Sequence, residues 1–375
     1  MASPCKQRRF VSHGGDVWGF ARKHKIPLEK VLDFSGPVNF LGPPPKAVEA
    51  VKEYARLIRF YPDPNPVELK IKIAEYVGHG VSSENIILGN GSIELIYMIA
   101  ELFRGNFKAV IPVPSFTEYE KAVLRLGGEP VFVQLPADFC LEPESVKKAI
   151  TGQTRMIFIC NPHSPSGTLF SRETILELLE FCQKKDVILS VDENYIEFSD
   201  KGEDATMAGY VKEYDKLFVI RSVTKFYGMP GIRLGYAMAA ECLVDQLETV
   251  RQPWSINSLA GVATLAAFND KEFIENTKRC VTREKAQLAM SLNDIEGLRV
   301  FPSETNFLLV KISGKRLTSI KLKEEMAEKG ILIRDCSTFV GLDDSYFRVT
   351  VRSAKENVIL VETLREIVLK DKYKD

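Results

Sequence analysis

The chain has 375 residues, of which 50 are basic and 50 acidic, so its formal net charge at pH 7 is zero. This balance argues against nucleic acid or an anionic membrane surface as the main partner. Seven scattered cysteines show no zinc or redox spacing, which predicts reduced thiols and a cytoplasmic protein. No apolar run is long enough to cross a bilayer, and the first residues lack the apolar core of a secretory signal.

From Pro45 onward, helical and strand patterns alternate, which is typical of a parallel or mixed α/β sheet. A helix with one apolar stripe is predicted from Pro45 to Ile58, followed by a proline-rich turn at 61–66 and a helix over 66–76. A further helix is expected at 172–184. Strands are expected at 85–88, 109–113, 130–133, 156–160, 187–191, 217–220 and 234–238.

After residue 257 the pattern changes, and a long charged helix is expected at about 272–292. Short strands are predicted at 306–310, 331–334 and 346–351, and a last amphipathic helix at about 355–369. The sequence therefore predicts a large α/β domain over 45–265 and a smaller α+β domain formed by 1–44 and 266–375.

Lys225 follows the predicted strand at 217–220, and the carboxyl edge of an open α/β sheet is where ligands bind. Small hydroxyls and an arginine that suit a phosphate lie close to it in the chain, namely Ser222, Thr224 and Arg233. A lysine, a phosphate cradle and an acid are the partners that pyridoxal phosphate needs. These residues therefore predict a pyridoxal-phosphate site.

Asp192 and Tyr195 follow the neighbouring strand at 187–191. A carboxylate bonded to the ring nitrogen of the cofactor keeps that nitrogen protonated, which makes the ring an electron sink. Asp192 is predicted to be that carboxylate, although an aspartate here also suits a simple turn cap. Tyr195 is placed to reach the phenolic oxygen of the ring, or to pack as a loop aromatic.

Ser92 and Ile93 open a predicted helix after a glycine turn, and the N–H groups of a helix start favour phosphate. The alternative is a structural turn with a serine N-cap. The dinucleotide fingerprint is not met because Glu94 replaces its last glycine, so no nicotinamide cofactor is expected. The four histidines form no ligand pattern, so no metal is expected either.

Over nearly its full length and in the right order, the chain resembles fold-type I pyridoxal-phosphate enzymes of the class I and II aminotransferase superfamily. The resemblance implies a large mixed seven-stranded sheet domain, a smaller α+β domain and active sites at a homodimer interface. It makes Lys225 the Schiff-base lysine, Asp192 the partner of the ring nitrogen and Tyr195 the partner of the phenolic oxygen. The other cofactor contacts that it implies are Ser92, Ile93, Phe116, Ser222, Thr224, Arg233 and, from the partner subunit, Tyr61.

One motif departs from this family. Its usual Asn-Pro-Asn-Asn-Pro-Thr-Gly reads Asn-Pro-His-Ser-Pro-Ser-Gly at 161–167, which puts Ser164 where an asparagine bonds the phenolic oxygen. A serine hydroxyl can donate, but it is shorter. A water or His163 is therefore expected to complete the contact.

Two branches that act on phosphorylated substrates fit the chain, namely L-threonine-O-3-phosphate decarboxylase of cobalamin biosynthesis and histidinol-phosphate aminotransferase. Segments at both ends are more similar to the decarboxylase, and they imply a set of substrate-binding residues: His13, Asn39, Arg334 and Arg348. The loop at 35–40 departs from the pattern of that branch.

A small molecule that carries both a carboxylate and a phosphate needs two cationic anchors, and the planar fork of arginine suits either anion. The bond at Cα that is held perpendicular to the cofactor ring is the one that breaks, so orientation selects transamination or decarboxylation. We take decarboxylation as the first hypothesis. Histidinol-phosphate amino transfer is the alternative, and a non-catalytic pyridoxal-phosphate-binding protein is the third hypothesis.

Overall fold

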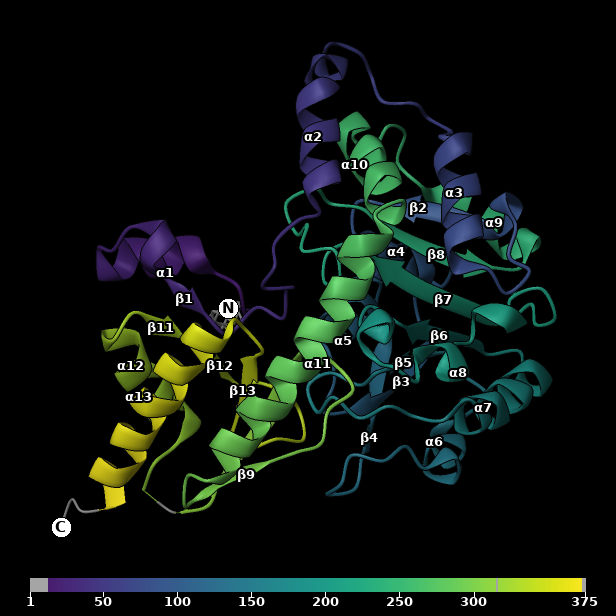
Figure 1. Cartoon of the computed structure of the whole chain (residues 1–375). Helices are drawn as coiled ribbons and strands as arrows, with labels where there is room; N and C mark the ends of the chain where they lie inside the picture. Colours follow the sequence, from purple (N-terminus) through teal and green to yellow (C-terminus); the bar gives the residue numbers. More distant parts are fainter. Residues whose placement is uncertain (1–12, 315, 373–375) are drawn as a thin grey trace, which may run out of the picture.

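The computed structural model of the chain describes residues 13–314 and 316–372, and its main feature is a mixed seven-stranded sheet (Figure 1). The strands follow the order β2-β8-β7-β6-β5-β3-β4. Their bounds are β2 Ile86–Gly89, β3 Lys108–Val113, β4 Glu129–Gln134, β5 Thr154–Cys160, β6 Ile188–Asp192, β7 Leu217–Ser222 and β8 Gly235–Ala239. All neighbours are parallel except β8, which runs antiparallel to β2 and β7.

The central strands are apolar because helices cover the sheet on both faces, as expected for parallel strands in α/β proteins. Every residue of β6 and β7 is buried. The helices around this sheet are α2 Pro45–Glu53, α3 Val67–Val77, α4 Ser92–Glu101, α5 Thr117–Arg125, α6 Pro143–Ala149, α7 Arg172–Lys185, α8 Gly202–Ala205, α9 Glu241–Val250 and α10 Ser258–Phe268. The predicted first helix is too long, because α2 ends at Glu53 and the 3-10 helix η2 (Ala55–Arg59) follows.

A second unit has a four-stranded sheet of order β12-β13-β10-β9 and a parallel pair β1-β11. Its strands are β1 Leu32–Asp33, β9 Leu298–Val300, β10 Phe307–Ile312, β11 Ile331–Leu332, β12 Arg334–Asp335 and β13 Tyr346–Thr350, and its helices are α1 Val17–His24, α12 Ser319–Glu328 and α13 Ala354–Lys372. The strand predicted at 331–334 is in fact two strands, since β11 pairs with β1 while β12 pairs with β13.

The long helix α11 (Lys271–Asn293) lies between the two units in Figure 1. It contacts β9 and β10 of the second unit and the 3-10 helix η4 (Ile196–Phe198) of the first. The predicted fold class, a mixed seven-stranded sheet with a smaller α+β unit, is confirmed. The boundaries at residues 45 and 265 stay predictions, and the part of the predicted small domain at 1–12 lies outside the described residues. No helix in the described ranges is long and apolar enough to span a membrane.

Candidate active site

The predicted site residues meet where the parallel strands β5, β6 and β7 end at one edge of the large sheet. Asp192 is the last residue of β6 and is paired with Cys160 of β5 and Ile220 of β7. Lys225 follows β7 after a short turn. Residues that are distant in sequence are therefore neighbours here, because parallel strands place their carboxyl ends together.

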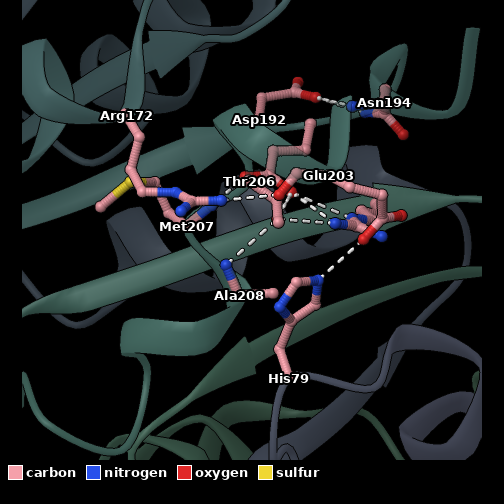
Figure 2. A network of polar contacts seen from close by, with 10 residues as sticks. His79, Arg172, Asp192, Asn194, Glu203, Thr206, Met207 and Ala208 are labelled. Atoms are coloured by element: carbon pink, nitrogen blue, oxygen red, sulfur yellow. Dashed lines mark hydrogen bonds and ion pairs between the residues drawn. The ribbon is translucent and has the colours of Figure 1, made fainter. Parts of the chain in front are cut away.

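Asp192 is buried and is held by three donors. The hydroxyl of Tyr119 donates to Oδ2 at 2.7 Å, and Asn194 donates to Oδ1 from its backbone N at 3.0 Å and from its side-chain Nδ2 at 2.7 Å. Figure 2 shows Asp192 and Asn194 turned toward one another. Burial raises the pKa of Asp192, whereas these hydrogen bonds and the positive charge of Lys225 oppose that increase. The geometry suits a carboxylate that stays ionised and can accept one further hydrogen bond.

Tyr119 was not predicted from the sequence, although it lies in the first turn of α5, three residues after Phe116. Its ring stacks on Phe158 at 4.8 Å and meets Phe116 edge-on at 5.6 Å. Burial, followed by the charge of Asp192, raises the pKa of Tyr119 well above its ordinary value. The hydroxyl therefore keeps its proton and acts as a donor.

Lys225 is half-buried, and burial followed by the nearby charge of Arg348 lowers its pKa to about 8. Asp192 acts in the opposite direction. A lysine with this pKa is partly neutral near physiological pH, which is the state that attacks a carbonyl.

The start of α4 gathers several donors that suit a phosphate, a group that we call the phosphate cradle. Gly91 has a φ of 77°, and a Cβ added there would lie 2.2 Å from Nη2 of Arg233. A Cβ added at Gly235 would lie 2.3 Å from the backbone N of Ser92. The first N–H groups of a helix, here those of Ser92 and Ile93, have no intrahelical acceptor. Glycine at 91 and 235 therefore lets the guanidinium of Arg233 and strand β8 approach the start of α4 closely, which gathers these donors at one place.

Two hydroxyls complete this cradle. Oγ of Ser222 is buried and has no hydrogen-bond partner in the described part of the chain, and half-buried Thr224 lies two residues further on. A buried hydroxyl without a partner is costly unless a ligand uses it. Ser222 is paired with Gly235, which lies against the start of α4, so the structure brings together the predicted phosphate contacts Ser92, Ser222 and Arg233. These donors fit the phosphate of pyridoxal phosphate.

Ser164 lies between Arg348 and Tyr195. Nη1 of Arg348 donates to Oγ of Ser164 at 3.1 Å. Tyr195 is buried, its ring meets Phe307 edge-on at 5.2 Å, and burial raises the pKa of its hydroxyl. A protonated Tyr195 is suited to donate to the phenolic oxygen of the cofactor.

The expectation that His163 completes this contact is wrong, because both of its ring nitrogens are engaged elsewhere. Nε2 lies 2.8 Å from the carbonyl oxygen of Pro114, and Nδ1 lies 2.7 Å from Oγ of Ser166. Burial lowers the pKa of His163 to about 4, so the ring is neutral. Nε2–H therefore donates to Pro114 and Nδ1 accepts from Ser166, which ties this loop to the segment before Phe116.

Arg334 and Arg348 lie directly opposite one another on β12 and β13, and both are buried. Nη2 of Arg348 is 3.4 Å from the carbonyl oxygen of Ser35, and its Nε has no hydrogen-bond partner among the described residues. Burial and the charge of Arg348 lower the pKa of Arg334. Two buried cations at one register position favour an anionic ligand between them. Nη2 of Arg334 also donates to Oγ1 of Thr338 at 3.0 Å, and Arg352 is paired with Glu356 at 2.7 Å.

The structure places the other two substrate-binding candidates differently. His13 lies beside the site, with Nε2 2.7 Å from Glu118 and its ring 5.9 Å from that of Phe116. Asn39 uses its side-chain amide within the fold, since Nδ2 donates to the carbonyl oxygen of Phe226 at 2.8 Å. Its backbone N donates to the carbonyl oxygen of Lys225 at 3.0 Å. The geometry therefore favours a role for Asn39 in holding the lysine segment.

Tyr61 lies on the surface of its own chain. Its side chain is 81% exposed, and its ring is tilted against that of Trp254 at 4.9 Å. The predicted contact from a partner subunit stays a prediction.

A buried ion pair joins the ends of β6 and β7, and the sequence analysis did not predict it. Nε and Nη2 of Arg221 donate to Oε2 of Glu193 at 3.0 and 2.9 Å, and Nη2 also donates to Thr206 at 2.7 Å. Glu193 accepts from the backbone N of Met207 at 2.7 Å, in the network of Figure 2. Such a satisfied network fixes the turn that carries Asp192 and Asn194.

The chain belongs to the aminotransferase class I and II family, whose model matches residues 29–364. Enzymes of this family depend on pyridoxal phosphate, and this chain is one of them. It is 40% identical to a protein provisionally named threonine-phosphate decarboxylase from Caldanaerobacter subterraneus subsp. tengcongensis, over 94% of this chain and 93% of the relative.

Two solved structures represent the two branches. The histidinol-phosphate aminotransferase of Clostridium acetobutylicum is 31% identical with a TM-score of 0.84, and the match covers 91% of this chain and 100% of that one. The L-threonine-O-3-phosphate decarboxylase of Porphyromonas gingivalis is 28% identical with a TM-score of 0.80, covering 90% and 100%. Both branches therefore share this fold.

Proposed function

We propose that the protein decarboxylates L-threonine-O-3-phosphate to carbon dioxide and aminopropanol phosphate, as a step of cobalamin biosynthesis. The observation that carries this proposal is the opposed pair Arg334 and Arg348 beside Lys225. The substrate has one carboxylate and one phosphate, and two buried guanidinium groups match these two anions. The relative at 40% identity supports the same choice.

We assign the carboxylate to Arg348, because its charge acts directly on Lys225 and its Nη1 contacts Ser164. Arg334 lines a cavity of about 500 Å³, together with His13 and Ser35, and this cavity has room for the phosphate end. Clamping both anions fixes how the substrate rotates about Cα, which selects the bond that breaks.

Lys225, Asp192 and the donors at the start of α4 would hold pyridoxal phosphate, which would supply an electron sink for the pair left on Cα when the bond to the carboxylate breaks. Arg348 orients the carboxylate until it leaves as carbon dioxide. Lys225, as an ammonium group, then delivers a proton from Nζ to the same carbon. Asp192, held by Tyr119 and Asn194, keeps the nitrogen end of the site negatively charged throughout.

Histidinol-phosphate amino transfer is the second candidate, and the 31% identity to the Clostridium acetobutylicum structure favours it. Histidinol phosphate carries a phosphate but no carboxylate, so one of the two arginines would have no anion while it is bound. Threonine phosphate supplies an anion to both arginines, whereas in amino transfer only the second substrate, the dicarboxylate 2-oxoglutarate, would do so.

The test uses purified protein reconstituted with pyridoxal phosphate and incubated with L-threonine-O-3-phosphate in the absence of any keto acid. We expect catalytic release of carbon dioxide and aminopropanol phosphate. Arg348→Lys should lower kcat about a hundredfold, whereas Arg334→Lys should mainly raise KM. Arg299→Ala, which removes an exposed arginine on β9, is the control. Carbon dioxide at background, with glutamate formed from histidinol phosphate and 2-oxoglutarate, would contradict the proposal. No turnover on either substrate, with cofactor binding intact, would instead support a non-catalytic protein.

We also propose that the enzyme is a cytoplasmic homodimer in which Tyr61 reaches the phosphate cradle of the partner. The strong exposure of this aromatic side chain supports the proposal.

A further inference from the structure

We propose that Asn194 is a positioning residue that fixes the Asp192 carboxylate and the Ser92 hydroxyl to one another, so that the nitrogen end and the phosphate end of the cofactor site form one unit. Asn194 is buried in the turn after β6. It was not a candidate in the sequence analysis. The proposal concerns cofactor binding and is therefore independent of which reaction the enzyme catalyses.

The side-chain amide of Asn194 bridges two elements that are far apart in sequence. Nδ2 donates to Oδ1 of Asp192 at 2.7 Å and to Oγ of Ser92, the first residue of α4, at 2.9 Å. An amide nitrogen has two protons, so it can make both bonds at once. The bridge runs from the end of β6 to the start of the helix that forms the phosphate cradle.

Chemistry fixes the orientation of this amide. A carboxylate only accepts hydrogen bonds, so turning the amide over would place two acceptors 2.7 Å apart. Oδ1 of Asn194 is buried and finds no donor in the described ranges. A buried acceptor without a donor costs stability. What the amide contributes is therefore its two donated bonds.

The bridge also decides how Ser92 can act. Because Asn194 donates to it, the Ser92 oxygen is the acceptor in that bond, and its own hydroxyl proton is directed elsewhere. The N–H groups of the first turn of α4 and the guanidinium of Arg233 lie around the same glycine turn. Asn194 thereby prepares Ser92 as a donor for the cofactor phosphate before the cofactor arrives.

The same amide prepares Asp192. Together with the backbone N of Asn194 and the hydroxyl of Tyr119, it supplies the third hydrogen bond to a buried carboxylate. These donors stabilise the charged form and restrict rotation of the carboxylate. The ring nitrogen of the cofactor then meets an acid that is already oriented.

The experiment measures the dissociation constant of pyridoxal phosphate from the apo protein by fluorescence titration, for wild type, Asn194→Ala, Ser92→Ala and the double variant. We expect Asn194→Ala to raise the dissociation constant at least about tenfold. We expect the double variant to be less impaired than the product of the two single effects, because Asn194 acts partly through Ser92. Asn269→Ala removes an exposed amide that bonds only within α10 and is the matched control, expected to bind as wild type.

Thermal melting of each apo protein separates positioning from folding. A dissociation constant within twofold of wild type, or effects of Asn194→Ala and Ser92→Ala that simply multiply, would overturn the proposal. If Asn194→Ala does not fold, Asn194→Leu carries the test. It keeps about the size of the side chain, adds no charge beside Asp192 and cannot donate, and it should weaken cofactor binding at least as much.

Discussion

At the scale of single residues, the site is a group of buried charges that alter one another. Burial and the charge of Arg348 lower the pKa of Lys225 to about 8. Burial raises the pKa of Asp192, and the hydrogen bonds that it accepts limit this rise. Each shift follows from placing ionisable groups where water is scarce. The group is therefore prepared for proton transfer near neutral pH.

The lowered pKa of Lys225 predicts its labelling behaviour. Only a neutral amine reacts with trinitrobenzenesulfonate, so labelling of Lys225 in the apo protein should rise with pH around a midpoint of about 8. In urea-unfolded protein the midpoint should move to about 10.4, the ordinary value for lysine. Mass spectrometry of the Lys225 peptide measures both curves, and coincident curves would contradict the prediction.

A second prediction concerns Tyr119→Phe, which deletes one donor to Asp192 and keeps the stacked ring. The pKa of the carboxyl should rise further, and affinity for pyridoxal phosphate should fall about tenfold. Fluorescence titration measures this. Tyr210→Phe, which removes a hydroxyl outside the site, is the control, and equal affinities for the two variants would show that the Tyr119 hydroxyl has no such role.

At the scale of elements, the first turn of α5 holds the segment before α1. Glu118 lies 2.7 Å from His13, 2.6 Å from Lys121 and 2.8 Å from the hydroxyl of Tyr97. Gly14 follows His13 and approaches the carbonyl oxygen of Ser35 so closely that a Cβ there would lie 2.2 Å from it. These contacts, which we call the clasp, therefore connect α5 to the segment after β1, where the carbonyl oxygen of Ser35 lies 3.4 Å from Nη2 of Arg348.

Glu118→Gln tests the clasp by removing the charge while keeping the shape. Burial alone would raise the pKa of Glu118, but its donors outweigh burial and lower the pKa to about 2. An acid whose pKa is lowered on folding stabilises the folded state at pH values above its unfolded-state pKa, here about 4.3. This stabilisation is lost as the pH falls toward 2. The variant should be less stable by on the order of 1 kcal/mol at pH 7, because solvent screens the partly exposed His13 and Lys121, and the difference should shrink below about pH 4.5. Urea unfolding at several pH values measures it, and a pH-independent difference would contradict the clasp.

At the scale of the whole molecule, apolar side chains gather on the surface after α2. Ile58, Phe60 and Tyr61 are 76%, 61% and 81% exposed. η2 and α2 contact α10, and a groove between Phe60, Tyr61 and Val262 is open on the same side. Exposed apolar groups of this size indicate a surface that another protein covers, and a second copy of the chain is the partner that we propose.

Sedimentation equilibrium should therefore give about twice the chain mass of 42.2 kDa. Ile58→Glu combined with Phe60→Glu should produce a monomer with little activity, because Tyr61 would no longer reach a partner. Met290→Glu, at a 69% exposed methionine on α11, is the control and should stay dimeric. A monomeric wild type would refute the dimer and the role of Tyr61 together.

The hydrophobic pattern and the order of elements along the chain were sufficient to predict the strands of the large sheet. They also predicted that Asp192 and Lys225 lie at the ends of two of these strands. Alternation of helix and strand requires a largely parallel sheet, and a parallel sheet brings its strand ends to one edge. These signals are local, and each spans only a few residues. Their geometric consequence follows from backbone regularity alone.

Other features depended on contacts that no local pattern contains. The bond between Arg348 and Ser35 joins residues 313 positions apart, and the split between β11 and β12 depends on which sheet each strand joins. Tyr119 donates to Asp192, Asn194 donates to Ser92, and His163 contacts Pro114 only because the folded chain brings these residues together. Periodicity determines which face a residue is on, whereas its partner is determined by packing between distant elements, and only the tertiary structure decided that.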